Sequence, residues 1–181
     1  MQQKRKSCQN LTRIINFCQL YSIIFLFASL ASFAYLTNSK FAYAESSEII
    51  SVTIKRLNNV RNNHGLDPLL VEYKLNTAAR AHAKYMSREN RLTHIGKGSK
   101  TLQRRLRDIN FDFKRAGETL ASNSSSNHDI IYQWLGSDRH REIILHSNYT
   151  HVGVGMARSD GTYYWVLIFA SMSDKLIKQS K

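Results

Sequence analysis

The spacing of apolar residues changes along the chain, from a helical period in the first part to alternation in the last. Between residues 49 and 60 apolar side chains recur every three to four positions, which predicts a helix that begins near Ser46 or Ser47 and ends at Gly65. The same spacing predicts a second helix from Glu72 to about Asn90. Its apolar face consists of Leu75, Ala78, Ala79, His82 and Met86. The small alanines on this face indicate that a neighbouring element approaches the helix closely.

Between residues 94 and 127 the spacing of apolar residues follows no single period, so several short elements are predicted. Residues 94–100 contain two glycines and no apolar period, so they predict a loop. Thr101 can cap a short basic helix that ends near Ile109. The stretch from Phe111 to Ala121 is expected to be extended, and residues 122–127, rich in serine and asparagine, to form a loop.

Two short helices and a hairpin are predicted for the last part of the chain. One helix runs through Trp134, capped by Asn127, and the next from Asp138 to Leu145. Apolar residues then alternate with glycines over residues 152–156, Gly161 makes a turn, and residues 163–170 form a buried strand. Because helices come before the terminal hairpin and no βαβ alternation occurs, we expect an α+β domain in which helices cover an antiparallel sheet.

The first 44 residues have the three parts of a targeting segment. They are a basic head (Lys4, Arg5, Lys6 and Arg13), an uncharged apolar run over residues 20–36, and the small-residue exit Ala42-Tyr43-Ala44. We therefore predict a cleaved signal peptide over residues 1–44, and a single domain over residues 45–181 with its core at about 51–170. The alternative is an uncleaved anchor formed by residues 20–36, although this run is slightly short for a span of about 20 residues. Either way, the domain is expected outside the cytoplasm.

Charge and cysteine content narrow the class of protein. The chain has a formal charge of +13, and +8 remains on residues 45–181, because five of the 26 basic residues and none of the 13 acidic ones precede Glu45. We expect such a domain to be attracted to anionic lipids, polysaccharides or nucleic acid, and the alternative is a basic soluble domain whose charge serves no partner. No run of five basic residues predicts a specific nucleic-acid site. Both cysteines, Cys8 and Cys18, precede the domain, which therefore has neither a disulfide nor thiol chemistry.

Three polar residues are candidates for chemistry. His94 opens a loop after a helix, Glu118 follows a glycine in an apolar setting, and His140 lies early in a short helix. Imidazole and carboxylate groups together can bind a divalent metal or exchange protons near neutral pH. They can equally form a buried network that only fixes the loops. Ser137 could act as a nucleophile with His140, but we expect it to cap the following helix, and we expect His82 to be a buried structural histidine.

Several ordered motifs resemble those of the SCP-like domains of the CAP superfamily, in its cysteine-free bacterial branch. They are Arg61–Leu69, Leu75–Met86, Leu92-Thr93-His94, Ala116-Gly117-Glu118, Trp134–Arg141, Val152–Gly155 and Tyr163–Phe169. The resemblance implies a three-layer α-β-α sandwich, with a shallow cleft lined by His94, Glu118 and His140. The chain departs from the family pattern at Thr119, where an asparagine is usual. It also departs at Ser137, near which many eukaryotic members have a second cleft glutamate.

The resemblance leaves more than one function open. We favour an exported, monomeric, non-enzymatic domain that binds a cell-envelope component, a lipid or another extracellular ligand through the His/Glu cleft. The alternative is a metal-dependent hydrolase, in which His94 and His140 would hold a divalent metal such as Zn²⁺. Glu118 would then bind the metal or act as general base. Without a second cleft glutamate, water would have to fill the remaining metal positions.

Overall fold

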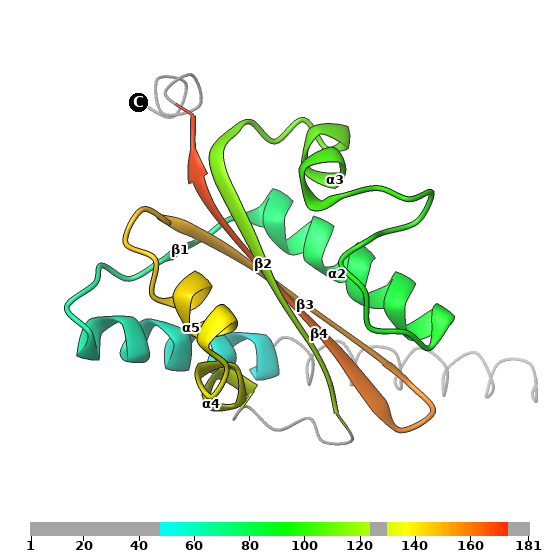
Figure 1. Ribbon diagram of the computed structural model, residues 1–181, viewed down its shortest axis with the longest axis horizontal. Coiled ribbons are helices and arrows are strands. Elements are labelled where there is room, and N and C mark those ends of the chain that lie inside the picture. Colours follow the sequence, from blue (N-terminus) through cyan, green and yellow to red (C-terminus); the bar gives the residue numbers. More distant parts are fainter. Residues whose placement is uncertain (1–47, 124–129, 174–181) are drawn as a thin grey trace, which may run out of the picture. The chain divides into compact units, whose positions relative to one another are not determined.

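A sheet with the strand order β1-β3-β4-β2 lies at the centre of the domain (Figure 1). The computed structural model describes residues 48–123 and 130–173, which all belong to the unit Ser46–Lys181. Strands β3 (His151–Ser159) and β4 (Thr162–Met172) form the predicted hairpin, which turns at Gly161 with a φ of +78°. Strand β2 (Phe113–Asn123) pairs antiparallel with β4 and forms one edge of the sheet.

The other edge of the sheet was not predicted. Strand β1 (Leu70–Val71) pairs with β3 in parallel and has only two residues. It follows the turn at His64-Gly65 and is held by two backbone hydrogen bonds, from Leu70 N–H to the Thr150 carbonyl and from Glu72 N–H to the Val152 carbonyl. A segment this short has no recognisable alternation, so the otherwise antiparallel sheet has one parallel pair that the sequence pattern does not reveal.

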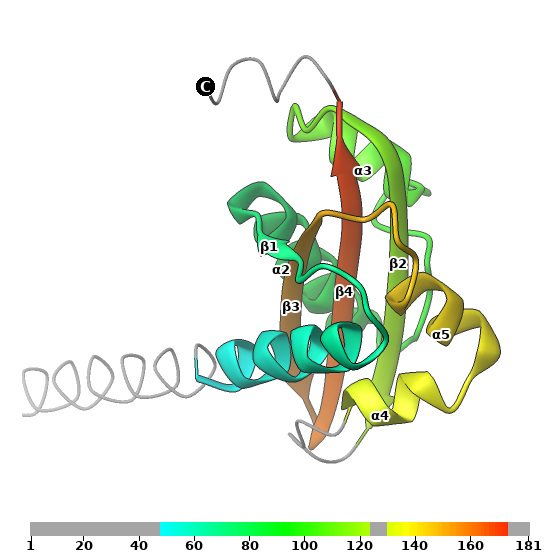
Figure 2. The same cartoon turned by 90° about the vertical axis from the view of Figure 1, so that its left-hand side faces the viewer.

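Helices cover both faces of the sheet, as Figures 1 and 2 show. The opening helix (residues 48–63), α4 (Ile130–Leu135) and α5 (Asp138–Ile144) pack on one face. Helices α2 (Tyr73–Glu89) and α3 (Leu102–Asp108) pack on the other. Strand β4 separates two cores, because its successive side chains point to opposite faces. Trp165, Leu167 and Phe169 belong to the first core, and Tyr164, Val166 and Ile168 to the second. The α+β sandwich is thereby confirmed.

The ends of the helices follow from local hydrogen bonds. The Glu72 carboxylate accepts from Lys74 N–H at the start of α2, and Asn90 ends that helix in the left-handed region. The Thr101 hydroxyl accepts from Arg104 N–H at the start of α3, as predicted. Ser137 occupies the N-cap position of α5, but its side chain makes no capping bond. The prediction of a side-chain cap at Ser137 was therefore wrong.

Helix α2 lies against β3 at backbone distance. A Cβ atom added to Gly153 would overlap the backbone of Leu75, and one added to Gly155 would overlap that of Ala79. These glycines are needed for close approach rather than for an unusual φ. The contact confirms the neighbour predicted from the alanines of α2, and it fixes the position of this helix over the sheet.

Some predictions concern residues outside the described ranges. They include the targeting segment over residues 1–44, with its apolar run 20–36, and the proposed capping residues Ser46, Ser47 and Asn127. Within residues 48–123 and 130–173, no helix is long and apolar enough to cross a membrane.

Candidate functional site

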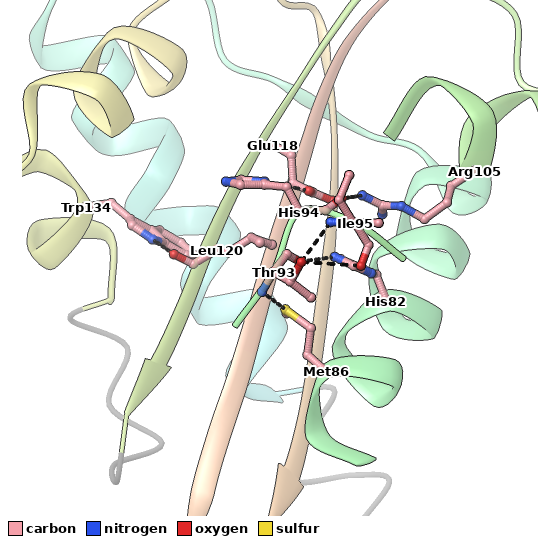
Figure 3. Close-up of polar contacts among 9 residues, drawn as sticks. All are labelled: His82, Met86, Thr93, His94, Ile95, Arg105, Glu118, Leu120 and Trp134. Atoms are coloured by element: carbon pink, nitrogen blue, oxygen red, sulfur yellow. Dashed lines mark hydrogen bonds and ion pairs between the residues drawn. The ribbon is translucent and has the colours of Figure 1, made fainter. Parts of the chain in front are cut away.

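Two of the three predicted site residues are in direct contact. Glu118 lies in the middle of β2 with its side chain 2% exposed, and His94 lies in the loop after α2 with its side chain 52% exposed. His94 Nδ1 and Glu118 Oε1 are 2.9 Å apart (Figure 3). The fold thus brings a buried carboxylate and a solvent-facing imidazole together across 24 residues of sequence.

Arg105, which was not among the predicted site residues, holds the other side of the carboxylate. Its Nη2 donates to Glu118 Oε2 at 2.7 Å and to the His94 carbonyl at 3.3 Å, and its side chain is only 10% exposed. The sequence contained a usable signal. Arg105 follows Leu102 by three positions and precedes Ile109 by four, so it lies on the apolar side of α3 rather than on the solvated side.

The contacts of Glu118 determine what His94 presents to solvent. A carboxylate only accepts hydrogen bonds, so in the neutral imidazole the proton lies on Nδ1 and donates to Glu118. His94 Nε2 then carries a lone pair. Both Glu118 oxygens are already bonded, one to His94 and one to Arg105. The carboxylate therefore orients the imidazole, and the accessible polar atom of the pair is His94 Nε2.

His140 comes from α5, on the other side of β2. Its half-buried ring stands edge-on to that of Trp134, with 6.5 Å between the centroids. Burial lowers the pKa of His140, and the charges of His94 and Arg139 lower it further. The influence of His94 means that the two imidazoles lie within electrostatic range. Since the lowered pKa favours the neutral form, His140 places an uncharged imidazole within electrostatic range of His94.

His82 anchors the loop that carries His94. It is 2% exposed, and its Nε2 lies 2.8 Å from the Thr93 carbonyl. Thr93 N–H in turn donates to Met86 Sδ at 3.5 Å (Figure 3). Burial lowers the pKa of His82, and the positive charge of Arg105 lowers it further. The buried structural role predicted for His82 is confirmed, since its ring fixes the residue directly before His94.

Trp134 and Gly117 support the site through packing. Trp134 is 1% exposed and donates from Nε1 to the Leu120 carbonyl of β2 at 2.9 Å, which confirms it as a core anchor. Gly117 precedes Glu118, and a Cβ atom there would overlap the Tyr149 hydroxyl. Because β2 passes this close to Tyr149, a larger residue at position 117 would shift the strand that carries Glu118.

Few side chains at the cleft could act as ligands of a metal ion. The described part of the chain contains no group of three or more His, Cys, Asp or Glu side chains that could hold an ion. His94 and His140 could supply two nitrogen ligands, and water would have to complete the coordination. Glu118, the third residue predicted for a metal, has both oxygens engaged, so it could join as a ligand only by releasing one of these bonds.

Comparison with known proteins identifies relatives of this domain. Residues 54–169 match the family model of the cysteine-rich secretory protein family, CAP. The uncharacterized membrane protein YlbC of Bacillus subtilis (strain 168) is 36% identical over 101 residues, which cover 56% of this chain and 29% of YlbC. This chain thus spans less than a third of the length of that relative.

Solved structures share the fold. An extracellular protein containing an SCP domain from Bacillus anthracis superposes with a TM-score of 0.63 at 26% identity, covering 69% of this chain and 41% of that one. An outer surface protein of Borrelia burgdorferi superposes with a TM-score of 0.65 at 20% identity, covering 70% of this chain and 94% of that one. At this low identity the second likeness shows the fold alone.

Proposed function

The chain belongs to the CAP family, and from this premise we propose that it is exported and binds a component of the cell envelope through the cleft of His94, Glu118 and His140. The observation that carries the proposal is the orientation of the His94 imidazole. The Glu118 carboxylate bonds to its Nδ1, and Arg105 holds that carboxylate in place. An oriented, exposed acceptor is suited to recognising a ligand that donates hydrogen bonds.

Export is supported by sequence and by relatives. The basic head and apolar run that precede residue 45 are typical of a targeting segment. The similar protein from Bacillus anthracis is described as extracellular, and YlbC as a membrane protein. The formal charge of +8 on residues 45–181 favours anionic envelope components as partners.

Sedimentation with envelope material tests the proposal. The purified protein is mixed either with peptidoglycan sacculi or with vesicles of phosphatidylglycerol and phosphatidylcholine, at low and at high salt. We expect saturable binding to one of these materials, weakened at least about tenfold in His94→Gln, because a hydrogen-bond partner is lost at an oriented site. His64→Gln is the matched control, because His64 is exposed and lies directly after the opening helix. Equal binding of the two variants would contradict a role for the cleft.

Salt dependence separates the cleft from general charge attraction. Screening shortens the range of exposed charges to about 10 Å at 0.1 M ionic strength, so the electrostatic part of binding should weaken as salt rises. The ratio between wild type and His94→Gln should persist, because that contact is local. A ratio that disappears at high salt would mean that the basic surface alone binds the envelope.

A metal-dependent hydrolase is the second candidate, and the same dyad favours it. A carboxylate behind Nδ1 is the arrangement that orients histidine ligands of metals. His94 and His140 would hold the ion, and Glu118 would orient His94 rather than act as the general base. When bound, Zn²⁺ supplies a hydroxide nucleophile by lowering the pKa of its water to about 7. Calorimetric titration with Zn²⁺ tests this candidate, because equal heats for wild type and a His94→Ala/His140→Ala double variant would exclude the site.

A further inference from the structure

A separate pocket of about 510 Å³ lies between α2, the loop before α3, and α3 itself. Much of its wall is apolar, from Ala78, Ala81 and Tyr85 of α2 and Ile109 after α3. Its volume falls in the range of about 300–1,000 Å³ that is usual for small-molecule sites. His94, Glu118 and His140 are not among the residues that line it, so the pocket is distinct from the cleft.

Two buried side chains of the wall have unused polar atoms. Arg105 uses only Nη2, and its Nε and Nη1 are buried with no hydrogen-bond partner among the described residues. His82 Nδ1 is likewise buried without a partner. Leaving such donors and acceptors unsatisfied costs about 1–3 kcal/mol each. Three unsatisfied atoms on two residues that line one hollow therefore point to a polar group that is supplied from outside the chain. Because these atoms have almost no accessible surface, such a group reaches them through a small shift of the two side chains.

The chemistry of the missing group follows from these atoms. Arg105 offers N–H donors. His82 Nε2 faces the Thr93 carbonyl and must donate to it, so neutral His82 offers an acceptor at Nδ1. A carboxyl group matches both. Its oxygens accept from Arg105, and one proton taken up from solvent on binding lies between a carboxyl oxygen and His82 Nδ1.

The rest of the wall sets the charge and shape of the ligand. Lys97 and Lys100 line the pocket. The carboxylate of Asp108 is neutralised by Lys100 at 2.6 Å and by Arg104 at 3.0 Å, so the surroundings remain favourable to an anion. The rings of His82 and Tyr85 lie nearly parallel, with 16° between their planes and 6.1 Å between their centroids. Because His82 is buried, the half-buried ring of Tyr85 is the aromatic group that the wall offers to a ligand.

We propose that this pocket binds a compact aromatic carboxylic acid, with its carboxyl group at Arg105 and His82 and its ring system against the apolar wall of α2. Such a ligand is flat and apolar at one end and charged at the other, so it complements the apolar and the polar parts of the lining. The proposal does not depend on the function of the cleft, because its test requires no ligand of His94.

Calorimetric titration with 2-naphthoate tests the pocket in the purified protein, and methyl 2-naphthoate is the neutral control. Charge-assisted hydrogen bonds are about twice as strong as neutral ones, so we expect one naphthoate per chain, bound at least about tenfold more tightly than the ester. Equal affinities would overturn the assignment of the carboxyl group to Arg105 and His82.

Two tryptophan variants locate the binding. Ala81 is exposed and lines the pocket, so Ala81→Trp should fill it without disturbing the core and should abolish naphthoate binding. Lys84, on the same helix, is also exposed but is not part of the lining, and Lys84→Trp should bind as wild type does. Binding that survives Ala81→Trp, or that both variants lose equally, would place naphthoate elsewhere and overturn the proposal.

Discussion

Two arginines, one on each side of the sheet, differ in how their guanidinium groups are used, although little of either side chain is exposed. Arg61, on the opening helix, is fully buried, and all three of its nitrogens donate to backbone carbonyls. The acceptors are Asp67 at 3.0 Å, Ile144 at 2.7 Å, His146 at 3.2 Å and Tyr149 at 3.4 Å. Arg105, on α3, uses one nitrogen, and its other two have no hydrogen-bond partner within residues 48–123 and 130–173.

The difference separates a structural arginine from one available to a ligand. Arg61 joins the opening helix to the end of α5 and to the chain before β3, so its hydrogen bonds are satisfied within the fold. Burial lowers the pKa of Arg61, and the nearby Asp67 opposes this shift. Arg105 instead bonds to the Glu118 carboxylate of the cleft and also lines the separate pocket between α2 and α3. Burial alone therefore does not tell the two roles apart, but the count of unpaired nitrogens does.

The largest effect is expected for Arg61→Met. Four carbonyls lose their donor at once, so we expect a loss of about 3 kcal/mol or more in the free energy of unfolding. Urea denaturation measures this loss. Arg104→Met, on the exposed side of α3, should change stability by less than about 0.5 kcal/mol. A loss at Arg61 no larger than at Arg104 would contradict the structural role.

A smaller loss of stability is expected for Arg105→Met, about 2 kcal/mol, because Glu118 keeps His94 as a partner. A double-mutant cycle with Glu118→Gln measures the coupling between the two side chains by urea denaturation. We expect the double variant to be more stable than the sum of the single losses predicts. Strict additivity would mean that the 2.7 Å contact contributes nothing to folding.

Acid should destabilise the protein partly through His82. Its pKa in the folded state lies below the ordinary value of 6.5 because of burial and of Arg105. The unfolded chain therefore binds the proton more readily, so this contribution is complete above about pH 6.5 and is lost as the pH falls. Between pH 7 and pH 5, His82→Gln should therefore lose less stability than wild type does. Parallel stability curves for the two proteins would contradict this prediction.

The smallest effect on folding is expected for Gly96→Ala. The new methyl group would lie 2.8 Å from Arg105 Cδ and 3.2 Å from Nε, so the arginine stem must shift. Because the stem is flexible, we expect a stability change below about 1 kcal/mol, with a several-fold weaker affinity for 2-naphthoate. Calorimetric titration of this variant measures the change. An unchanged affinity would show that the position of Arg105 does not govern the pocket.

Apart from β1, the sequence predicted the helices and strands of the described residues, for identifiable reasons. Apolar residues at helical spacing predicted α2, and the apolar residues that alternate with glycines or form a continuous run predicted β3 and β4. The spacing within α2 also identified His82 as buried. The motif resemblance selected His94 and Glu118, which are in contact. That resemblance did not supply their geometry, because 24 residues separate them and only the fold brings them together.

The missed features depend on tertiary context. Arg105 lies in a basic helix, and charge there suggests solvent rather than a buried carboxylate on a strand. Strand β1 is two residues long and is defined only by its partner β3. Ser137 has the residue type and position of a helix cap, yet its hydroxyl does not bond to α5. In each case the deciding contact is with an element or a backbone geometry that local composition does not encode.

The glycine contacts of β3 have a kinetic consequence for the pocket. Because α2 touches the sheet backbone at Gly153 and Gly155, this wall cannot retreat to admit a ligand. Any widening of the pocket for a larger ligand then falls on the opposite wall, which consists of α3 and the loop that Gly96 and Lys100 close with a backbone hydrogen bond of 2.8 Å. Such widening should accordingly follow the rate at which this seven-residue helix shifts rather than the stability of the whole domain.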